Sequence, residues 1–347
     1  MFGGQGSNDY RGWADDLTTD NPPVGPYPLA VSYVIEWDAD CNADGKVDYG
    51  QIQHGDLQDL NQNGIPDICA YKSYPVGKNP QDLVFASGYM FVANKDDSSI
   101  SKINIKTGAA TSTFLAGGRP YTVKFDGTYL WTANINDGTV SKLTTAGVLK
   151  GTYPVGAEPA RIAYDGSNIW VSLAGEGRVA KISRSTGAVL GVYNVGSTPH
   201  GILFDGTYIW VVNGPYLSAG SITKLSKTGV TLGTFVTGGL TSRDIVTDGT
   251  FLYVSNYSSG TISKIRKTDG VIVNTLNPGI GVNRMLYEAH QLWSANDSVN
   301  TVTRFDLVDD TLSETISFQA GTYPVAIGFD GIKVWSSNPG TASVSAF

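Results

Sequence analysis

Carboxylate and amide side chains with the spacing of a metal-binding loop follow residue 39 of the 347-residue sequence. Taking Asp40 as position one puts oxygen-bearing side chains at positions one, three, five and nine and a glycine at position six, namely Asp40, Asn42, Asp44, Asp48 and Gly45. Ca²⁺ takes oxygen ligands from alternate positions of such loops, and glycine permits the sharp turn. Position twelve is Gln51, where stronger loops supply a bidentate Glu, so the pattern predicts a weak calcium site.

A second loop repeats this spacing shortly afterwards. Its corresponding residues are Asp59, Asn61, Asn63, Gly64 and Asp67. Such loops bind calcium at position seven through a backbone carbonyl. Lys46 in the first loop and Ile65 in the second occupy this position and complete the predicted ligand sets. Asp, Asn and Gly also form ordinary turns without any metal. Two tandem loops with ligand types at alternate positions favour calcium over plain turns.

The two loops read D-x-N-x-D-G-x-V-D and D-x-N-x-N-G-I-P-D-x-C. They resemble the calcium loops of dockerin modules and thrombospondin type-3 repeats. The resemblance implies a Ca²⁺ cofactor and an extracellular module at residues 38–69.

The only two cysteines, Cys41 and Cys69, bracket this loop pair. Their placement predicts a disulfide that closes the module, and therefore an oxidising compartment. Two buried thiols are the alternative. Zinc binding is disfavoured, because zinc sites use more ligands at closer spacing.

Residues 1–37 contain one clear strand pattern, at residues 31–37. G-W-A-D-D from Gly12 and Y-V-I-E-W from Tyr33 resemble the closing strands of a C-type lectin-like domain, with Ala14 where that family often has Asn. The resemblance implies that this segment is the tail of an upstream domain and that the chain is part of a longer or processed protein.

Composition limits the possible partners. The net charge is -7 and the sequence pI is about 4.9, which argues against nonspecific binding to nucleic acid. No apolar run approaches the roughly 18 residues of a membrane span, so membrane insertion is not expected. With 42 glycines and only 16% charged residues, the chain fits many short strands and few helices.

The rest of the chain, residues 70–347, is a sevenfold repeat. Its copies begin at Pro80, Pro120, Pro159, Pro199, Ser242, Val282 and Pro324. In each copy two alternating apolar runs flank a turn, commonly Asp-Gly, as in a β-hairpin, and two further strands follow. Four strands every 39 to 43 residues predict an all-β, seven-bladed β-propeller.

Two positions recur within the copies. An aromatic residue comes eleven residues after each start: Phe91, Trp131, Trp170, Trp210, Tyr253, Trp293 and Trp335. We expect these side chains to fill the space between blades. Three residues later every copy except the third, which has Leu173, carries Asn. Asn tolerates positive φ, so these residues are interpreted as turn formers.

The seventh copy stops after three strands. The segment from Tyr74 to Gly77 repeats the Y-P-V-G that closes the second copy at Tyr153. Residues 70–77 are therefore predicted to supply the outer strand of the seventh blade. The first and last segments of the repeat region would then share one blade and leave no open sheet edge.

The repeat pattern P-x-x-I-x-F-D-G-x-x-I-W-V-x-N resembles YVTN-type and NHL-like propellers and the virginiamycin B lyase group. The resemblance extends from Tyr71 to Phe347. It implies the propeller fold and says little about function, because propellers host many functions.

First strands of propeller blades line the central channel, so the residues after each start are expected at one mouth. The candidate ligand-binding residues are Gln81, Tyr121, Arg161, His200, Arg243 and Arg284, with Asp82, Asp244 and Asn283 beside them. Three arginines at one mouth predict an anionic or sugar ligand. The alternative is that a wet channel mouth is polar without binding anything.

His200 is the weak catalytic candidate. The segment P-H-G-I-L-F-D-G from Pro199 is similar to the lyase motif that carries a catalytic His, which implies a general acid or base. In that pattern an acidic residue follows fourteen positions later, and here the position is Gly214. A lone His makes a poor catalytic constellation.

The sequence thus predicts an upstream domain tail (1–37), a calcium module (38–69) and a propeller (70–347). The expected function is non-enzymatic: extracellular or surface-displayed binding, such as adhesion, receptor recognition or assembly on a cell envelope or virion. Expected partners are a protein or carbohydrate on a surface, or copies of the chain itself. A propeller-mouth enzyme of lyase type is the alternative.

Overall fold

A computed structural model describes residues 72–308 and 311–347. The lectin-like tail, both calcium loops, and Cys41 and Cys69 lie outside the described residues. The described part consists of strands β1 to β28 and one 3-10 turn, η2 (Pro339–Thr341), so the expected scarcity of helix is confirmed there. Within these ranges no helix has the length and hydropathy needed to cross a membrane.

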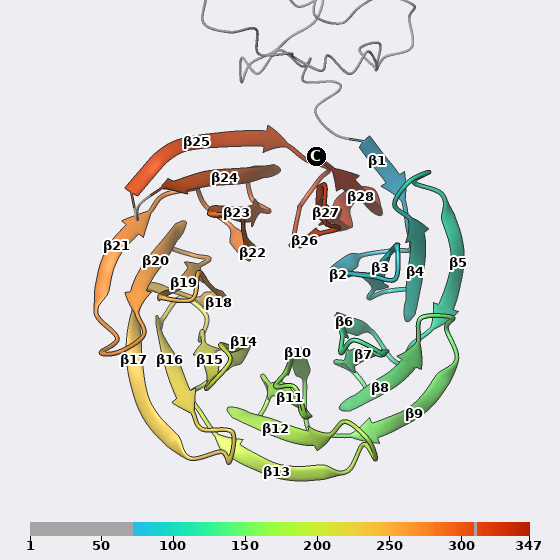
Figure 1. Ribbon diagram of the computed structural model, residues 1–347, viewed down its shortest axis with the longest axis horizontal. Coiled ribbons are helices and arrows are strands. Elements are labelled where there is room, and N and C mark those ends of the chain that lie inside the picture. The colour runs from blue at the N-terminus through green and yellow to red at the C-terminus, as the bar shows by residue number, and fades with distance from the viewer. Residues whose placement is uncertain (1–71, 309–310) are drawn as a thin grey trace, which may run out of the picture. The chain divides into compact units, whose positions relative to one another are not determined.

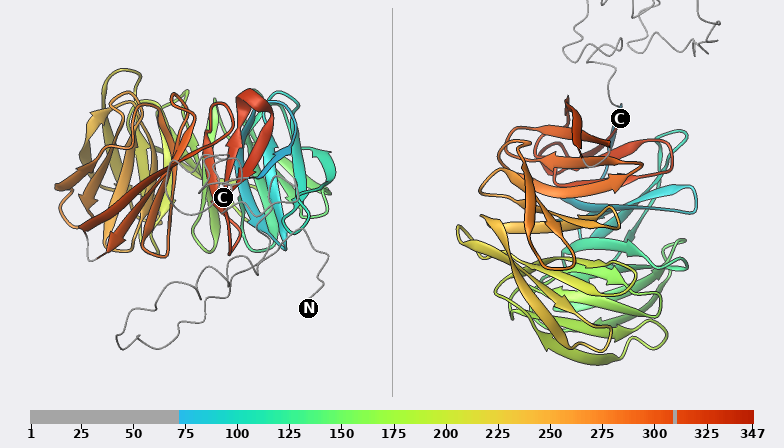
Figure 2. Two further views of the ribbon diagram at one scale, coloured as in Figure 1. Left: turned by 90° about the horizontal axis from the view of Figure 1, so that it is seen from above. Right: turned by 60° about the vertical axis from the view of Figure 1, so that its left-hand side comes forward.

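The strands form seven four-stranded antiparallel sheets arranged as the blades of a ring. In Figure 1 the first strand of each blade lies nearest the axis and the fourth lies at the rim. Figure 2 shows the same ring from its side, with the strands running across its thickness. The predicted all-β, seven-bladed propeller is confirmed.

Blades 1 to 3 are continuous in sequence. Blade 1 comprises β2 (Pro80–Ala86), β3 (Tyr89–Asn94), β4 (Ser99–Asn104) and β5 (Ala110–Leu115). Blade 2 comprises β6 (Pro120–Phe125), β7 (Tyr129–Asn134), β8 (Thr139–Thr144) and β9 (Leu149–Pro154). Blade 3 comprises β10 (Pro159–Tyr164), β11 (Asn168–Leu173), β12 (Arg178–Ser183) and β13 (Val189–Asn194).

Blades 4 to 6 follow the same order. Blade 4 comprises β14 (Pro199–Phe204), β15 (Ile209–Asn213), β16 (Ala219–Leu225) and β17 (Thr231–Leu240). Blade 5 comprises β18 (Ser242–Thr247), β19 (Phe251–Asn256), β20 (Thr261–Arg266) and β21 (Ile272–Leu276). Blade 6 comprises β22 (Val282–Glu288), β23 (Gln291–Asn296), β24 (Thr301–Val308) and β25 (Thr311–Gln319).

Blade 7 joins the two ends of the ring. It contains β26 (Ala326–Phe329), β27 (Val334–Asn338) and β28 (Ser343–Ala346), and β1 (Lys72–Pro75) completes it. β1 pairs antiparallel with β28, with Tyr74 opposite Val344. The predicted closure by a shared blade is confirmed, and it covers the β28 edge that would otherwise stay open.

The apolar core lies between the blades. Seven clusters of buried side chains occur among the described residues, and each joins two neighbouring blades. The recurring aromatic residues belong to them: Trp131, Trp170, Trp210 and Trp335 are fully buried or nearly so. Their predicted role as filler between blades is confirmed.

The joint between blades 3 and 4 combines three residues that are distant in sequence. Trp170 of β11 stacks on Tyr193 of β13, with ring centroids 5.6 Å apart. The same Tyr193 ring packs against Gly229, in the turn before the fourth strand of blade 4, where an added Cβ would lie 2.0 Å from Tyr193 Cε1. Gly229 also has φ of 87°, so this turn requires glycine for its backbone and for the close approach.

Where an Asp-Gly turn joins the first two strands of a blade, its aspartate hydrogen-bonds the aromatic residue five positions later. Asp165 Oδ1 accepts the backbone N–H of Ser167 and Asn168, and its Oδ2 accepts the indole N–H of Trp170 at 2.8 Å. Corresponding bonds join Asp126 to Trp131, Asp205 to Trp210 and Asp330 to Trp335. The turn is thereby tied to the buried core.

The interpretation of the recurring Asn residues as turn formers is wrong. Asn134 is fully buried at the end of β7, and its Nδ2 donates to Thr139 Oγ1 at 3.0 Å and Ser141 Oγ at 2.9 Å in β8. A buried amide needs partners, and the third strand supplies two hydroxyl groups. Asn256 and Asn296, which lie in N-x-S sequons, are fully buried and bonded in the same way.

Candidate functional site

The innermost strands bring most of the predicted mouth residues together. We call Asp82, Lys124, Arg161, His200, Arg243, Asp244 and Arg284 the axial cluster. They lie on β2, β6, β10, β14, β18 and β22, the strands nearest the axis in Figure 1. The hairpin geometry of each blade fixes their height, since every first strand begins at the same end of the ring.

Arg284 is held between two carboxylates from different blades. Its Nη2 lies 3.2 Å from Asp82 Oδ1, and its Nε lies 3.4 Å from Asp244 Oδ2. Burial alone would lower the pKa of Arg284, but the two carboxylates outweigh it and raise that pKa. Arg284 is therefore permanently charged.

Both carboxylates also bond the next blade. Asp82 accepts the hydroxyl of Thr122, and the N–H of Val123 at 3.2 Å. Asp244 accepts the N–H of Met285 at 2.9 Å. These contacts fix the acidic groups before any ligand arrives, so the positions of the charges are preorganised.

Arg161 and Arg243 each lie over a tyrosine ring. The Arg161 guanidinium carbon is 4.5 Å from the Tyr121 ring centroid, and Arg161 Nη1 donates to Tyr121 O at 2.8 Å. The Arg243 guanidinium carbon is 3.8 Å from the Tyr257 ring centroid. Burial, followed by repulsion from Arg284, lowers the pKa of Arg161. Stacking on the rings restricts both guanidinium groups.

Lys124 is a member of the cluster that the sequence did not single out. Its side chain is exposed, so water reaches it, but the surrounding strands limit its hydration. Desolvation therefore lowers the pKa of Lys124, with Asp82 and Asp244 opposing that effect and Arg284 adding to it. The available signal was its position: the fifth residue of the other six repeat copies is apolar or glycine.

His200 lies among cations rather than beside an acid. Burial, followed by the charges of Arg161 and Arg243, lowers its pKa to about 3. Among the described residues no side chain hydrogen-bonds its imidazole, and only its backbone oxygen accepts a bond, from Ser172 Oγ at 2.7 Å. The imidazole is neutral at physiological pH.

Two predicted mouth residues point to other partners. Gln81 Nε2 donates to Asn79 Oδ1 at 2.6 Å, and Asn283 Nδ2 donates to Asp297 Oδ2 at 3.1 Å. Neither side chain bonds the axial cluster. A ligand-binding role for Gln81, Tyr121, Arg161, His200, Arg243 and Arg284 stays a prediction.

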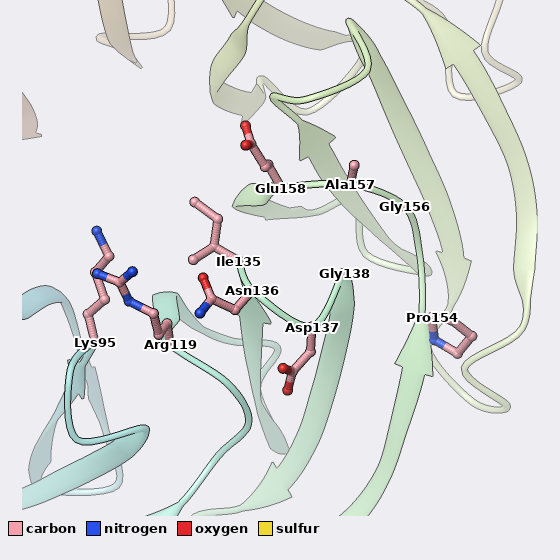
Figure 3. A pocket seen from close by; sticks show the side chains of 10 residues that line it. All are labelled: Lys95, Arg119, Ile135, Asn136, Asp137, Gly138, Pro154, Gly156, Ala157 and Glu158. Carbon is pink, nitrogen blue, oxygen red and sulfur yellow. The ribbon is translucent and has the colours of Figure 1, made fainter.

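A hollow of about 820 Å³ lies on the same side of the ring, over blades 1 to 3 (Figure 3). Arg119 and Glu158, the residues immediately before β6 and β10, contribute to its wall. Figure 3 shows Lys95 and Arg119 on one side of the hollow and Glu158 on another. Lys95 Nζ is also 5.3 Å from the centroid of the Tyr121 ring, over which Arg161 of the axial cluster lies. The hollow therefore adjoins the cluster.

Within residues 72–308 and 311–347, no three His, Cys, Asp or Glu side chains converge as a metal site. The predicted calcium ligands are outside these ranges, so calcium binding stays a prediction.

Solved structures of other proteins share this fold. Streptogramin B lyase matches with a TM-score of 0.67 and 18% identity, over 80% of this chain and 96% of that chain. A catalytically inactive virginiamycin B lyase from Staphylococcus aureus with quinupristin matches equally well, at 0.67 and 18%, over 80% of this chain and 98% of that chain.

Proteins with quite different roles match to the same degree. Hydrazine synthase of Kuenenia stuttgartiensis gives a TM-score of 0.66 at 16% identity, covering 79% of this chain and 96% of that chain. A chain of the mitotic checkpoint complex gives 0.68 at 13%, covering 80% and 94%. No protein-family model and no curated protein matches the sequence. At these identities the likeness shows the propeller fold and leaves function to the site.

Proposed function

We propose that this protein is a non-enzymatic binding protein that holds an acidic group of its ligand or partner at the axial cluster. The observation that carries the proposal is the gathering of Lys124, Arg161, Arg243 and Arg284 around one axis, in a chain of net charge -7. Positive charge concentrated in an otherwise acidic protein favours anionic partners at that place.

The surroundings of the cluster support recognition of a larger partner as well. Loops before β6 and β10 form the adjoining hollow, and propeller chains in assemblies such as the checkpoint complex share the fold. Display outside the cell or on a virion, for adhesion, receptor recognition or assembly, is the proposed setting. The calcium loops and the cysteine pair support it, because both are typical of extracellular modules.

A lyase-type enzyme is the second candidate, favoured by the fold and by the motif around His200. An acidic side chain at position 214, where the lyase pattern has the partner of the histidine, would not fit this backbone. A Cβ added at Gly214 would lie 1.7 Å from Ser242 O. Neighbouring arginines also disfavour the imidazolium form that a general base must reach after taking a proton.

The two candidates are separated by His200→Ala, assayed for quinupristin consumption and for thermal stability. A binding protein should consume no quinupristin in either form and keep its Tm. Turnover by the wild type that disappears in His200→Ala would overturn the proposal.

Binding itself is tested with immobilised acidic and neutral oligosaccharides and by sedimentation for self-association. Lys124→Glu reverses a charge in the cluster, and Lys150→Glu makes the same change on β9 at the rim of the same blade. We expect only Lys124→Glu to weaken binding. Equal effects of both variants would contradict a role for the cluster.

A further inference from the structure

The axial cluster carries an uncompensated positive charge. Four cationic groups, Lys124, Arg161, Arg243 and Arg284, stand with two carboxylates, Asp82 and Asp244, and four minus two leaves an excess of two. Arg284 uses both carboxylates. In the part of the chain that the structure describes, no carboxylate forms an ion pair with Lys124, Arg161 or Arg243.

Two donors in the cluster also have no acceptor. Arg243 Nε and Arg284 Nη1 are buried and hydrogen-bond to no acceptor among the described residues, whereas Arg284 Nε has only its ion pair with Asp244 Oδ2 at 3.4 Å. Buried N–H groups normally find partners, because leaving them unmet costs free energy. The fixed planes of Arg161 and Arg243 on their tyrosine rings make these guanidinium groups suited to a rigid acceptor.

A purely structural role accounts for only part of this arrangement. Asp82 and Asp244 bond neighbouring blades and Arg284 joins the two, so these three residues link blades 1, 2, 5 and 6. Lys124 adds nothing to that linkage. It is exposed, close to the same carboxylates and to Arg284, and it is the one charged side chain at its repeat position.

We infer that the axial cluster binds one compact dianionic oxyanion, such as a dicarboxylate or a tetrahedral oxyanion, among Arg161, Arg243, Arg284 and Lys124. The inference rests on the proposed binding function and specifies the charge and size of the ligand. Two negative charges neutralise the excess of two. Guanidinium forks supply paired N–H donors to either kind of oxyanion, and Lys124 supplies a point charge from the side that water reaches.

Isothermal titration at constant ionic strength tests the inference with two probes, malonate and sulfate. We expect one ion to bind per chain with either probe, and the tighter probe identifies planar or tetrahedral geometry. Lys124→Gln should weaken binding by about tenfold or more, the loss expected for a charged hydrogen bond. Lys150→Gln, at the rim of the same blade, should bind like the wild type.

Neither substitution removes a side-chain hydrogen bond that the structure shows, so Tm should stay near that of the wild type and folding should not confound the result. Failure of both probes to bind, or equal weakening by Lys124→Gln and Lys150→Gln, would overturn the inference. If neither probe binds but partner binding persists and still depends on Lys124, the proposed function stands alone. If neither probe binds and partner binding does not depend on Lys124, both the inference and the proposed function are overturned.

Discussion

Asp165 illustrates how one side chain stabilises a turn and a core residue together. Burial would raise its pKa, but hydrogen bonds from Trp170 and from the backbone of Asn168 and Ser167 outweigh burial and lower the pKa. Similar bonds lower the pKa of Asp205, and the pKa of Asp126 is lowered by its hydrogen bond to Arg184 together with such bonds. Because the folded-state pKa lies below the unfolded value of about 3.9, this stability is complete above that pH and is lost as pH falls through the folded-state pKa.

Asp165→Asn should therefore lower Tm at pH 7 and make Tm fall less as the pH is lowered. The amide keeps the shape but loses the charge, and charged hydrogen bonds contribute about 1.5–3 kcal/mol each. Thermal melts between pH 7 and pH 2 measure both effects. An acid dependence identical to that of the wild type would show that this carboxylate does not stabilise the fold in the way described.

The sequence revealed only part of the chemistry at this scale. His200, Arg161, Arg243 and Arg284 could be placed at one mouth because the repeat start fixes their height. Lys124 was missed because it occupies an otherwise apolar position. The bonds of Asp165 and Asn134 were missed because a residue pattern does not show which neighbouring strand supplies its partners.

Blades 2 and 3 differ at the position where the end of the second strand contacts the third strand. Blade 2 uses Asn134 bonded to Ser141, whereas blade 3 has Leu173 with Ala180 at the matching place in β12. Both Leu173 and Ala180 are fully buried. Each pair is internally consistent, one polar and one apolar.

Asn134→Leu alone should therefore destabilise the protein by about 1–3 kcal/mol, because hydroxyl groups in β8 lose their donor. Adding Ser141→Ala, which recreates the blade 3 pair, should cost less than the sum of the two single changes. Urea unfolding of the four proteins completes the cycle. Strict additivity would contradict the proposed coupling.

Across the whole molecule, β1 is expected to matter as much as any internal outer strand. Tyr74 of β1 stacks on Trp335 with centroids 5.5 Å apart, and its ring packs against Gly108 of blade 1. Tyr193 makes the equivalent contacts with Trp170 and Gly229 inside the ring. The closing joint thus has the same construction as an internal one.

Tyr74→Ala and Tyr193→Ala should lower stability by similar amounts, about 2–3 kcal/mol for half-buried aromatic residues. Urea midpoints of the two variants provide the comparison. An unchanged midpoint for Tyr74→Ala, with a lowered one for Tyr193→Ala, would show that β1 does not hold the ring closed.

Repeat length, hairpin turns and the Tyr-Pro-Val-Gly match were enough to predict blade number and closure, because each depends on spacing along the chain. The joints between blades were not predictable in the same way. Gly229 and Tyr193 meet only after the blades pack, and a glycine in a turn already has a local explanation. The charge balance at the axis likewise appears only once six strands converge.

The most direct test of the account follows the imidazole of His200 by NMR as pH is lowered, with and without sulfate. Without sulfate, burial and the charges of Arg161 and Arg243 should keep the ring neutral at pH 5, in accordance with a pKa of about 3. Bound sulfate should offset those charges and raise the midpoint. Titration near the ordinary pKa of about 6.5, with no response to sulfate, would contradict an axial cluster that binds anions.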